Sequence, residues 1–512
     1  MLRGHAKSMS RTHSLLLTPP RIVPPLDPGF RPVAVGNRAY RAAVSTSKKK
    51  VPLAIALERK PGSVSRYDTE ILPPGGANSA DTFRYVERLV KFLLWQYGGW
   101  RVVVGGPPEI GGHIQAIYSA SGARTFDFHF LGPVYQKEFQ VDAVRHKDVP
   151  ASCESPVALG GHLDGYRIGF DLGASDYKIA AVIDGKAVFT QEIPWDPKIE
   201  PDPDWHYEKI NHGLKLAASK LPRVDAIGGS AAGIYVNNEV MAASLFRAVP
   251  GELFAKKVRP LFLRMQKEWG VPLDVANDGD VTALAGGMSL HDHSVLGCAM
   301  GSSEAAGFLN GDGQITGWLN ELAFAPVDYN PDAAMEEWSK DRGVGALYFS
   351  QQAVAKLAPA AKIGLPAGRP PTESGTGRAL ASSASERRDL ATGGPAKPGG
   401  SPSASRQAEQ LACVQDLHRK NDPRAEKLFE TIGIYLGYSI AYYAAMYACR
   451  HLLIMGRVTS GRGGDVILQK AHEVLKMEFP ETAESVELHV PDEKMRRIGQ
   501  AVSAASLPVI TK

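Results

Sequence analysis

The sequence has few cysteines, and they are not arranged in pairs. The 512-residue chain contains four, Cys153, Cys298, Cys413 and Cys449, and none of them forms a CxxC motif. This spacing excludes a disulfide framework and a structural zinc site built from cysteine pairs. The chain also lacks a large excess of charge of one sign, because its 58 basic and 54 acidic residues give a net charge of only +4. Without a concentrated basic face or a helix-turn-helix pattern, we expect no nucleic-acid partner.

The sequence also lacks a run apolar enough to span a membrane. One uncharged run, residues 431–449, is rich in tyrosine and poor in leucine and valine, whereas a spanning helix is more apolar. Within it Gly433, Gly437, Ala441 and Ala445 recur at every fourth position and form a stripe that another backbone can approach. The run therefore predicts a buried helix of a soluble protein. With no secretory signal visible, we expect a cytoplasmic protein with no membrane partner.

Composition divides the chain into segments. The first 26 residues are basic and contain no acidic residue, which is typical of a transit peptide or of a disordered tail. Proline pairs at 19–20 and 24–25 would break the amphipathic helix of a transit peptide. We therefore predict that residues 1–32 form a disordered tail. Residues 33–150 are predicted to form an N-terminal α/β region of unknown role, and residues 165–512 the main domain. Residues 369–408, rich in Gly, Pro, Ser and Ala, predict a disordered insertion in that domain.

The N-terminal region shows a hairpin followed by alternating helices and strands. Residues 52–57 and 63–67 flank a Lys-Pro-Gly turn, which predicts the hairpin. Residues 83–97 have the spacing of an amphipathic helix, and residues 100–104 form a strand that enters a Gly/Pro turn before a helix at 110–118.

Three motifs of the main domain follow one another in a fixed order. A strand ends in Asp171-Leu-Gly173 and continues through Ser175 into a hairpin, where small residues let backbone N–H groups face an anion and Asp171 can hold Mg²⁺ through water. A second strand runs into a glycine-rich bend that contains Gly233 and Asn237. A third strand ends at an Asn-Asp pair, residues 277–278, before a helix of small residues.

This order resembles the ROK family of sugar kinases and sugar-responsive regulators. The resemblance implies an α/β fold, the two-lobed actin-like ATPase (ribonuclease H-like) fold. It also implies that Asp278 is the general base that takes the proton of a sugar hydroxyl, while Asn277 binds a neighbouring hydroxyl and the loop with Gly233 and Asn237 contacts the sugar. Taken alone, Asp278 is better explained as the cap of the helix that follows, and only the ordered set of motifs favours its role as the base.

The phosphate side of the family pattern is altered here. The segment with Gly301, Ser302, Ser303 and Gly307 resembles the family's second phosphate loop, but it has Ser303, Ala305 and Ala306 where the family tends to have glycine, and Glu304 lies within it. A carboxylate there would oppose a triphosphate unless it points away. The turn at Gly456 resembles the adenosine-contacting segment, and Arg457 replaces its second glycine. Three roles for Arg457 are open from the sequence: it contacts a phosphate, it pairs with Glu304, or it blocks the pocket for the base.

A further stretch carries the last sugar-side match. Glu321 matches the family's acid that binds sugar hydroxyls. Phe324 stands about where the family has a histidine that also serves zinc, and the accompanying Cys-rich motif is absent, so we predict no zinc. The Phe324 ring would stack on a sugar or belong to the core.

The sequence therefore predicts an ATP- and Mg²⁺-dependent kinase that phosphorylates a hydroxyl of a small-molecule sugar. The alternative is a non-catalytic sugar-sensing protein with a degraded ATP site, motivated by Glu304 and Arg457. An actin-like ATPase without a sugar is the third reading. The resemblance alone suggests a homodimer.

Overall fold

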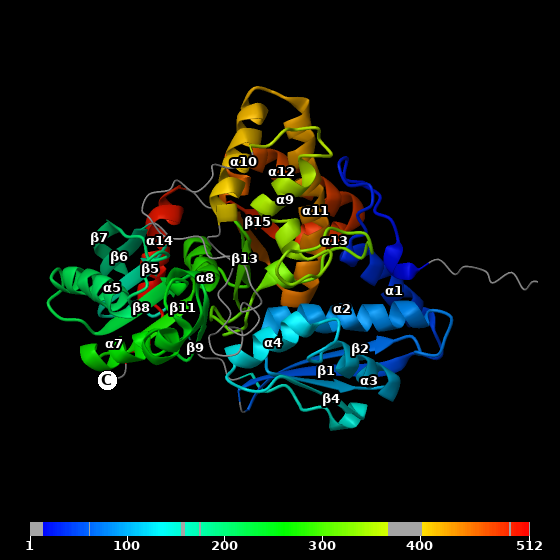
Figure 1. Ribbon diagram of the computed structural model, residues 1–512, viewed down its shortest axis with the longest axis horizontal. Coiled ribbons are helices and arrows are strands. Elements are labelled where there is room, and N and C mark those ends of the chain that lie inside the picture. Colours follow the sequence, from blue (N-terminus) through cyan, green and yellow to red (C-terminus); the bar gives the residue numbers. More distant parts are fainter. Residues whose placement is uncertain are drawn as a thin grey trace, which may run out of the picture.

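The chain folds into an N-terminal α/β region and two lobes, each built on a β-sheet (Figure 1). The computed structural model describes residues 14–60, 62–154, 159–173, 176–366, 402–490 and 493–510. In Figure 1 the N-terminal region is blue to cyan, most of the first lobe is green, and the second lobe runs from yellow-green to orange-red.

The N-terminal region contains a four-stranded sheet in the order β2-β1-β3-β4. Strand β1 pairs antiparallel with β2 and β3, and β3 pairs parallel with β4. The predicted hairpin and helices are present, with somewhat longer bounds. The elements are α1 (Val33–Thr46), β1 (Val51–Lys60), β2 (Ser63–Ile71), α2 (Ser79–Tyr97), β3 (Arg101–Gly105), α3 (Pro108–Ile117), α4 (Thr125–Val134) and β4 (Gln140–Val144).

The first lobe has a five-stranded sheet in the order β11-β8-β5-β6-β7. Strands β5, β6 and β7 form antiparallel hairpins. On the other side of β5, strands β8 and β11 extend the sheet in parallel. The elements are β5 (Tyr166–Leu172), β6 (Asp176–Ile183), β7 (Lys186–Pro194), α5 (Pro203–Ala218), β8 (Ala226–Ala231), β9 (Ile234–Val236), β10 (Glu239–Ala242), α6 (Gly251–Leu253), α7 (Leu261–Trp269), β11 (Leu273–Asn277) and α8 (Asp278–Leu290).

The second lobe repeats most of this topology in a sheet of order β13-β12-β14-β15. Here β12 and β13 are antiparallel, and β14 and β15 continue in parallel with β12. The elements are β12 (Val295–Met300), β13 (Glu304–Leu309), η5 (Leu322–Phe324), η6 (Gly345–Leu347), α9 (Gln351–Leu357), α10 (Pro402–Arg419), α11 (Pro423–Tyr447), β14 (His451–Met455), η8 (Arg457–Thr459), α12 (Arg462–Glu478), α13 (Pro480–Ser485) and β15 (Glu487–His489).

Two helices lie between the sheets. Helix α8 contacts β12 and β13 of the second lobe, and the last helix, α14 (Glu493–Ala505), returns to cover β5, β6 and β8 of the first lobe. The doubled sheet topology, with these crossing helices between the sheets, is the two-lobed actin-like fold. The predicted fold class is confirmed.

The predicted buried helix is α11, and its stripe of small residues faces α12. A Cβ on Gly433 would lie 2.6 Å from the Ile467 carbonyl oxygen, and one on Gly437 would lie 2.7 Å from that of Ala471. The absence of side chains there lets the two helix backbones approach closely. The stripe ends at Ala441, because Ala445 is exposed. Among the described residues, no helix has the length and apolar character needed to cross a membrane.

Two predictions at the segment ends require correction. Residues 14–32, predicted as part of a disordered tail, lie against the core: Leu16 and Phe30 are fully buried, and the Ile22 N–H donates to the Tyr438 hydroxyl of α11. Burial of these two apolar side chains stabilises the segment against the core. Residues 1–13 and most of the predicted insertion at 369–408 lie outside the described residues, but 402–408 begin helix α10.

The N-terminal region shares one continuous hydrophobic core with the second lobe. Helix α2 lies between them (Figure 1) and is buried on nearly all sides, as expected for a helix that packs on two layers. A buried ion network crosses the same boundary, in which Asp341 of the second lobe pairs with Arg88, Lys91 and Arg124. The region therefore has a fixed position on the lobes.

Candidate functional site

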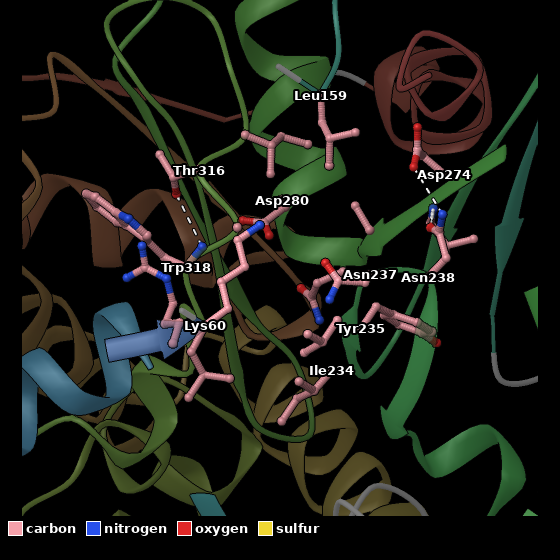
Figure 2. A pocket seen from close by; sticks show the side chains of 18 of the residues that line it. Lys60, Leu159, Ile234, Tyr235, Asn237, Asn238, Asp274, Asp280, Thr316 and Trp318 are labelled. Carbon is pink, nitrogen blue, oxygen red and sulfur yellow. Dashed lines mark hydrogen bonds between the residues drawn. The ribbon is translucent and has the colours of Figure 1, made fainter. Parts of the chain in front are cut away.

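A cavity of about 230 Å³ lies where the first lobe, the second lobe and the N-terminal region meet. Figure 2 shows Tyr235 and Asn237 on one side of it and Thr316, Trp318 and Lys60 on the other. The lining comes from the β9–β10 hairpin, the end of β11, the first turn of α8, residues 315–319 and the β1–β2 hairpin. Of the predicted sugar-side residues, Gly233, Asn237 and Asn277 line this cavity.

The β9–β10 hairpin is shaped by two asparagines in the left-handed conformation, Asn237 with φ 51° and Asn238 with φ 63°. Positive φ at both central residues gives the tight turn that suits a two-residue hairpin. The Asn238 amide donates to the Leu273 carbonyl at 2.7 Å and accepts the Val275 N–H at 2.9 Å, which fixes the turn to β11. The exposed Asn237 side chain makes no hydrogen bond within the described chain, so its amide is available to a ligand.

Asn277 holds the junction between β11 and α8. Its Oδ1 accepts the Gly279 N–H at 2.8 Å, which makes it the N-cap of α8, and its Nδ2 donates to the Gly233 carbonyl at 2.6 Å. Asn277 thus ties the helix start to the glycine bend. The cap that the sequence allowed for Asp278 belongs mainly to Asn277, although Asp278 Oδ1 also lies 3.1 Å from the Gly279 nitrogen.

Asp278 begins α8 directly after Asn277 of the cavity wall, but it is not itself part of the lining. Burial raises the pKa of Tyr235, Asp280 and Asp171, and the negative charge of Asp278 raises each of these pKa values further. Tyr235 and Asp280 line the cavity, whereas Asp171 does not. Such coupling requires short distances, because charge interactions fall off with separation. The register gives the same neighbourhood, because Asp171 pairs with Ser230 of β8 and Ser230 pairs with Ala276 of β11, so Asp171 and the start of α8 lie at one end of the sheet. The roles predicted for Asp171 and Asp278 stay predictions.

Asp171 is buried at the end of β5. Its Oδ1 accepts from the Ser230 hydroxyl at 2.7 Å, and its Oδ2 lies 3.7 Å from the Lys178 ammonium. Burial raises the pKa of Asp171 to about 6, although Ser230 and Lys178 lower it. Gly173 follows in the same turn, where a Cβ would lie 2.6 Å from the Asp176 carbonyl oxygen. Ser175, also predicted at the phosphate, lies outside the described residues.

The turns predicted to hold phosphate and adenosine lie side by side, because β12 and β14 are neighbours in the sheet. Gly456 has φ 106°, and a Cβ there would lie 2.4 Å from the Met300 carbonyl oxygen just before Gly301. Only glycine fits this contact. Ser302 is exposed and Ser303 half-buried in the turn after β12. Both hydroxyls can donate hydrogen bonds.

Gly307 has a different place from the one predicted. It lies inside β13, opposite Gly297, and not in the turn. A Cβ on Gly307 would lie 2.0 Å from the Gly279 carbonyl carbon, so the missing side chain lets α8 rest on β13. Its assignment to a phosphate loop is corrected to packing beneath the helix that carries Asp278.

Glu304 points away from the phosphate turn and into the core. It is 2% exposed, and its Oε1 accepts from the Tyr443 hydroxyl of α11 at 3.1 Å. Burial raises the pKa of Glu304 to about 8, while Tyr443 and Cys298 lower it. The carboxyl is therefore uncharged at neutral pH and does not oppose a triphosphate. Arg457 does not pair with it: its side chain is exposed and forms no ion pair within the described chain.

Glu321 is buried two residues after Leu319 of the cavity wall and does not itself line the cavity. Its charge contributes, after burial, to the raised pKa of both Asp280 and Glu304, so it lies near both. Phe324 belongs to the core, with its ring centroid 4.4 Å from that of Trp95. The stacking role of Phe324 on a sugar is therefore excluded, because neighbouring aromatic rings surround it.

Several residues of the site were missed in the sequence. Arg59, Lys60 and Tyr135 of the N-terminal region line the cavity, but nothing local marks them, because their role depends on how that region docks. Asp280 lines it as well. Burial raises its pKa to about 7, and its Oδ1 accepts from Asn320 at 2.9 Å. The run Asn-Asp-Gly-Asp, with a second carboxylate two residues after Asp278, was the signal for it.

Comparison with known proteins gives matches among solved structures. No family model and no curated protein matches the chain. A ROK hexokinase from Thermus thermophilus is 15% identical with a TM-score of 0.47, covering 67% of this chain and 97% of that one. A ROK family transcriptional regulator, a homolog of the E. coli MLC protein, is 18% identical with a TM-score of 0.47, covering 66% and 77%.

A ROK family glucokinase from Streptomyces griseus, in complex with glucose and AMPPNP, is another similar structure. It is 17% identical with a TM-score of 0.41, and the match covers 67% of this chain and 98% of that one. The fold of this chain is established by its own strand order and pairing.

Proposed function

We propose that the cavity binds a sugar and that the protein transfers a phosphoryl group from ATP to one of its hydroxyls. The observation that carries this proposal is the position of Asp278, which follows Asn277 of the cavity wall and lies at the same end of the sheet as Asp171. Phosphoryl transfer needs a carboxylate beside the attacking hydroxyl and a metal-bound phosphate on its other side.

In this proposal Asp278 accepts the hydroxyl proton. Asn277 holds the helix start that orients Asp278, because its amide is fixed at both ends. Asn237, exposed in the cavity wall, donates to or accepts from sugar hydroxyls. Asp280, two residues after Asp278, accepts a hydrogen bond from the Asn320 amide, which fixes its side chain at the cavity wall.

The residues around Asp171 fit Mg²⁺ held through water. Hard cations take oxygen ligands, and Asp171 Oδ1 and Oδ2 have one hydroxyl donor and one ammonium 3.7 Å away, which leaves lone pairs for bound water. The ion, when bound, neutralises charge that develops on the phosphate oxygens. Lys178 adds a positive charge at the same place, and the turns at Gly301 and Gly456 would hold the nucleotide.

A screen of the purified protein against aldohexoses and N-acetylhexosamines with Mg-ATP tests this proposal. We expect ATP-dependent formation of a sugar phosphate from at least one of them. ATP hydrolysis that does not depend on any sugar would contradict sugar phosphorylation and favour the actin-like ATPase.

A sugar sensor without catalysis is the second candidate, and Arg457 favours it. An arginine stands where the family pattern has glycine, at the turn proposed to hold adenosine. Isothermal titration with Mg-ATP and the same sugars separates the two candidates. Sugar binding with no detectable nucleotide binding would support the sensor and exclude the kinase.

A further inference from the structure

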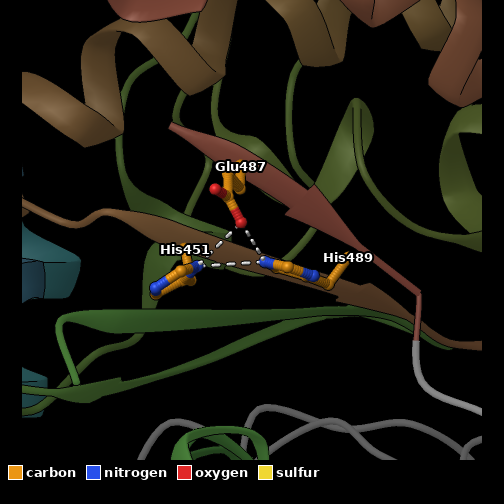
Figure 3. Close-up of side chains that lie close together, drawn as sticks. All are labelled: His451, Glu487 and His489. Carbon is orange, nitrogen blue, oxygen red and sulfur yellow. Dashed lines mark hydrogen bonds and ion pairs between the residues drawn. The ribbon is translucent and has the colours of Figure 1, made fainter. Parts of the chain in front are cut away.

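Three potential metal ligands meet at the edge of the second-lobe sheet (Figure 3): His451 of β14, and Glu487 and His489 of β15. Their meeting follows from the strand register. His451 pairs with Glu487 across the two parallel strands, and His489 lies two residues beyond Glu487. Side chains alternate along a strand, so all three project from the same face.

The ligand atoms have the spacing of a metal site. His451 Nδ1 lies 3.0 Å from His489 Nε2, and Glu487 Oε2 lies 3.7 Å from the first and 3.6 Å from the second. Three atoms at these separations lie on a circle of radius about 2.0 Å, which matches the ~2.0–2.2 Å bonds that zinc forms to histidine nitrogen and carboxylate oxygen.

A carboxylate behind His451 orients it for this role. His451 Nε2 lies 2.9 Å from Asp292 Oδ2, and Arg450 pairs with the other oxygen of Asp292. With its Nε2 hydrogen-bonded to this carboxylate, His451 turns its Nδ1 toward His489 and Glu487, which is the arrangement of metal-ligating histidines that are held by a carboxylate.

The second imidazole is also suited to binding. His489 turns its Nε2 toward His451 Nδ1, and the two nitrogens lie 3.0 Å apart. A histidine must be uncharged at the nitrogen that binds a metal. Glu487 is mostly exposed, so an ion can enter from solvent.

We propose that His451, His489 and Glu487 bind one divalent transition-metal ion, with zinc as the best match and water completing its coordination. Two imidazoles and one carboxylate form a donor set that zinc favours. The ion would tie the three-residue edge strand β15 to β14, just before the chain returns to the first lobe through α14. None of these residues belongs to the motifs from which the absence of zinc was predicted.

Zinc titration of the chelator-treated full-length protein tests the proposal, with cobalt absorption as a spectroscopic report. We expect one equivalent to bind to the wild type. His489→Ala should weaken binding by about 100-fold or more, and Asp292→Asn by about 10- to 100-fold through the lost orientation of His451. Zinc should raise the Tm of the wild type but not of His489→Ala, since a ligand stabilises the state that binds it.

Two further variants control the test. His472→Ala removes a histidine of the neighbouring helix α12 and should leave zinc binding unchanged. Glu487→Gln changes a side chain that is 72% exposed, so its metal-free Tm should match the wild type while its zinc binding weakens. Failure of the wild type to bind zinc stoichiometrically, or equal binding by His489→Ala and His472→Ala, would show that the two histidines form only a hydrogen-bonded pair.

Discussion

Glu304 shows how one residue can change the interpretation of a motif. In the sequence it stands inside a predicted phosphate loop, where a negative charge would weaken nucleotide binding. In the structure its Oε1 accepts a hydrogen bond from the Tyr443 hydroxyl, and its Oε2 occupies the place that a side chain on Gly345 would take. This Oε2 is buried without a hydrogen-bond partner in the described chain. A neutral carboxyl explains both features, because an ionised one would be costly to bury.

The protonation of Glu304 predicts a pH dependence of stability. Its pKa is about 8 in the folded state against 4.5 for the free group. Because the pKa is raised, the neutral Glu304 side chain makes its full contribution to the free energy of unfolding below pH 4.5, and this contribution is lost as the pH rises towards 8. Glu304→Gln lacks this loss, so its advantage in free energy of unfolding over the wild type should grow by about 3 kcal/mol from pH 5 to 7.

Thermal unfolding of both proteins at pH 5, 6 and 7 measures this effect. Glu484→Gln, at an exposed position, provides the control and should follow the wild type at every pH. A difference in Tm between Glu304→Gln and wild type that stays constant with pH would show that Glu304 is ionised in the fold.

At the scale of elements, the contact between α8 and β13 positions the proposed base. Gly279 in the first turn of α8 and Gly307 in β13 touch through their backbones. Gly307→Ala would place a Cβ 2.0 Å from the Gly279 carbonyl carbon. Overpacking of this kind costs about 1–3 kcal/mol, and here it must also displace Asp278.

We therefore expect Gly307→Ala to lower both the Tm and any sugar-dependent phosphorylation. Gly311→Ala is the matched control, because its Cβ would meet only the Ser294 hydroxyl at 3.5 Å. Wild-type values for Gly307→Ala in both measurements would mean that α8 does not depend on this contact.

The sequence predicted most elements but not how they meet. The hairpin at residues 52–67, the helix α2 and the strand-turn-helix around Asn277 follow from local patterns of hydrophobicity and turn residues. The place of Lys60 in the cavity wall has no local signal, because it depends on contacts between distant segments. Gly307 was misplaced for the same reason, since a glycine in a loop and one beneath a helix look alike in sequence.

On the scale of the whole molecule, the docking of the N-terminal region shapes the cavity. Burial by itself would raise the pKa of Asp341, but the charges of Lys91, Arg88 and Arg124 outweigh it and hold that pKa well below its usual range. The stabilising effect is thus present above the ordinary pKa of aspartate and is lost only in acid. The predicted tail contributes too, because residues 14–32 cover α11.

Asp341→Asn should weaken this docking. Removing one partner leaves buried cations without full compensation, which costs about 3–5 kcal/mol. We expect a lower Tm and, because Arg59 and Lys60 would lose their place, weaker sugar binding in calorimetry. Asp332→Asn alters an exposed aspartate nearby and should change neither quantity. Unchanged sugar affinity despite a lower Tm would separate the N-terminal region from the cavity.

The central claim is that Asp278 acts on a hydroxyl bound in the cavity, next to a phosphate held near Asp171. Phosphoryl transfer and sugar affinity, measured together for wild type, Asp278→Asn and the exposed control Asp312→Asn, test it most directly. We predict that Asp278→Asn loses about 100- to 10,000-fold in turnover while its sugar affinity stays within a few-fold, and that Asp312→Asn matches the wild type. Turnover by Asp278→Asn at the wild-type rate would contradict the claim.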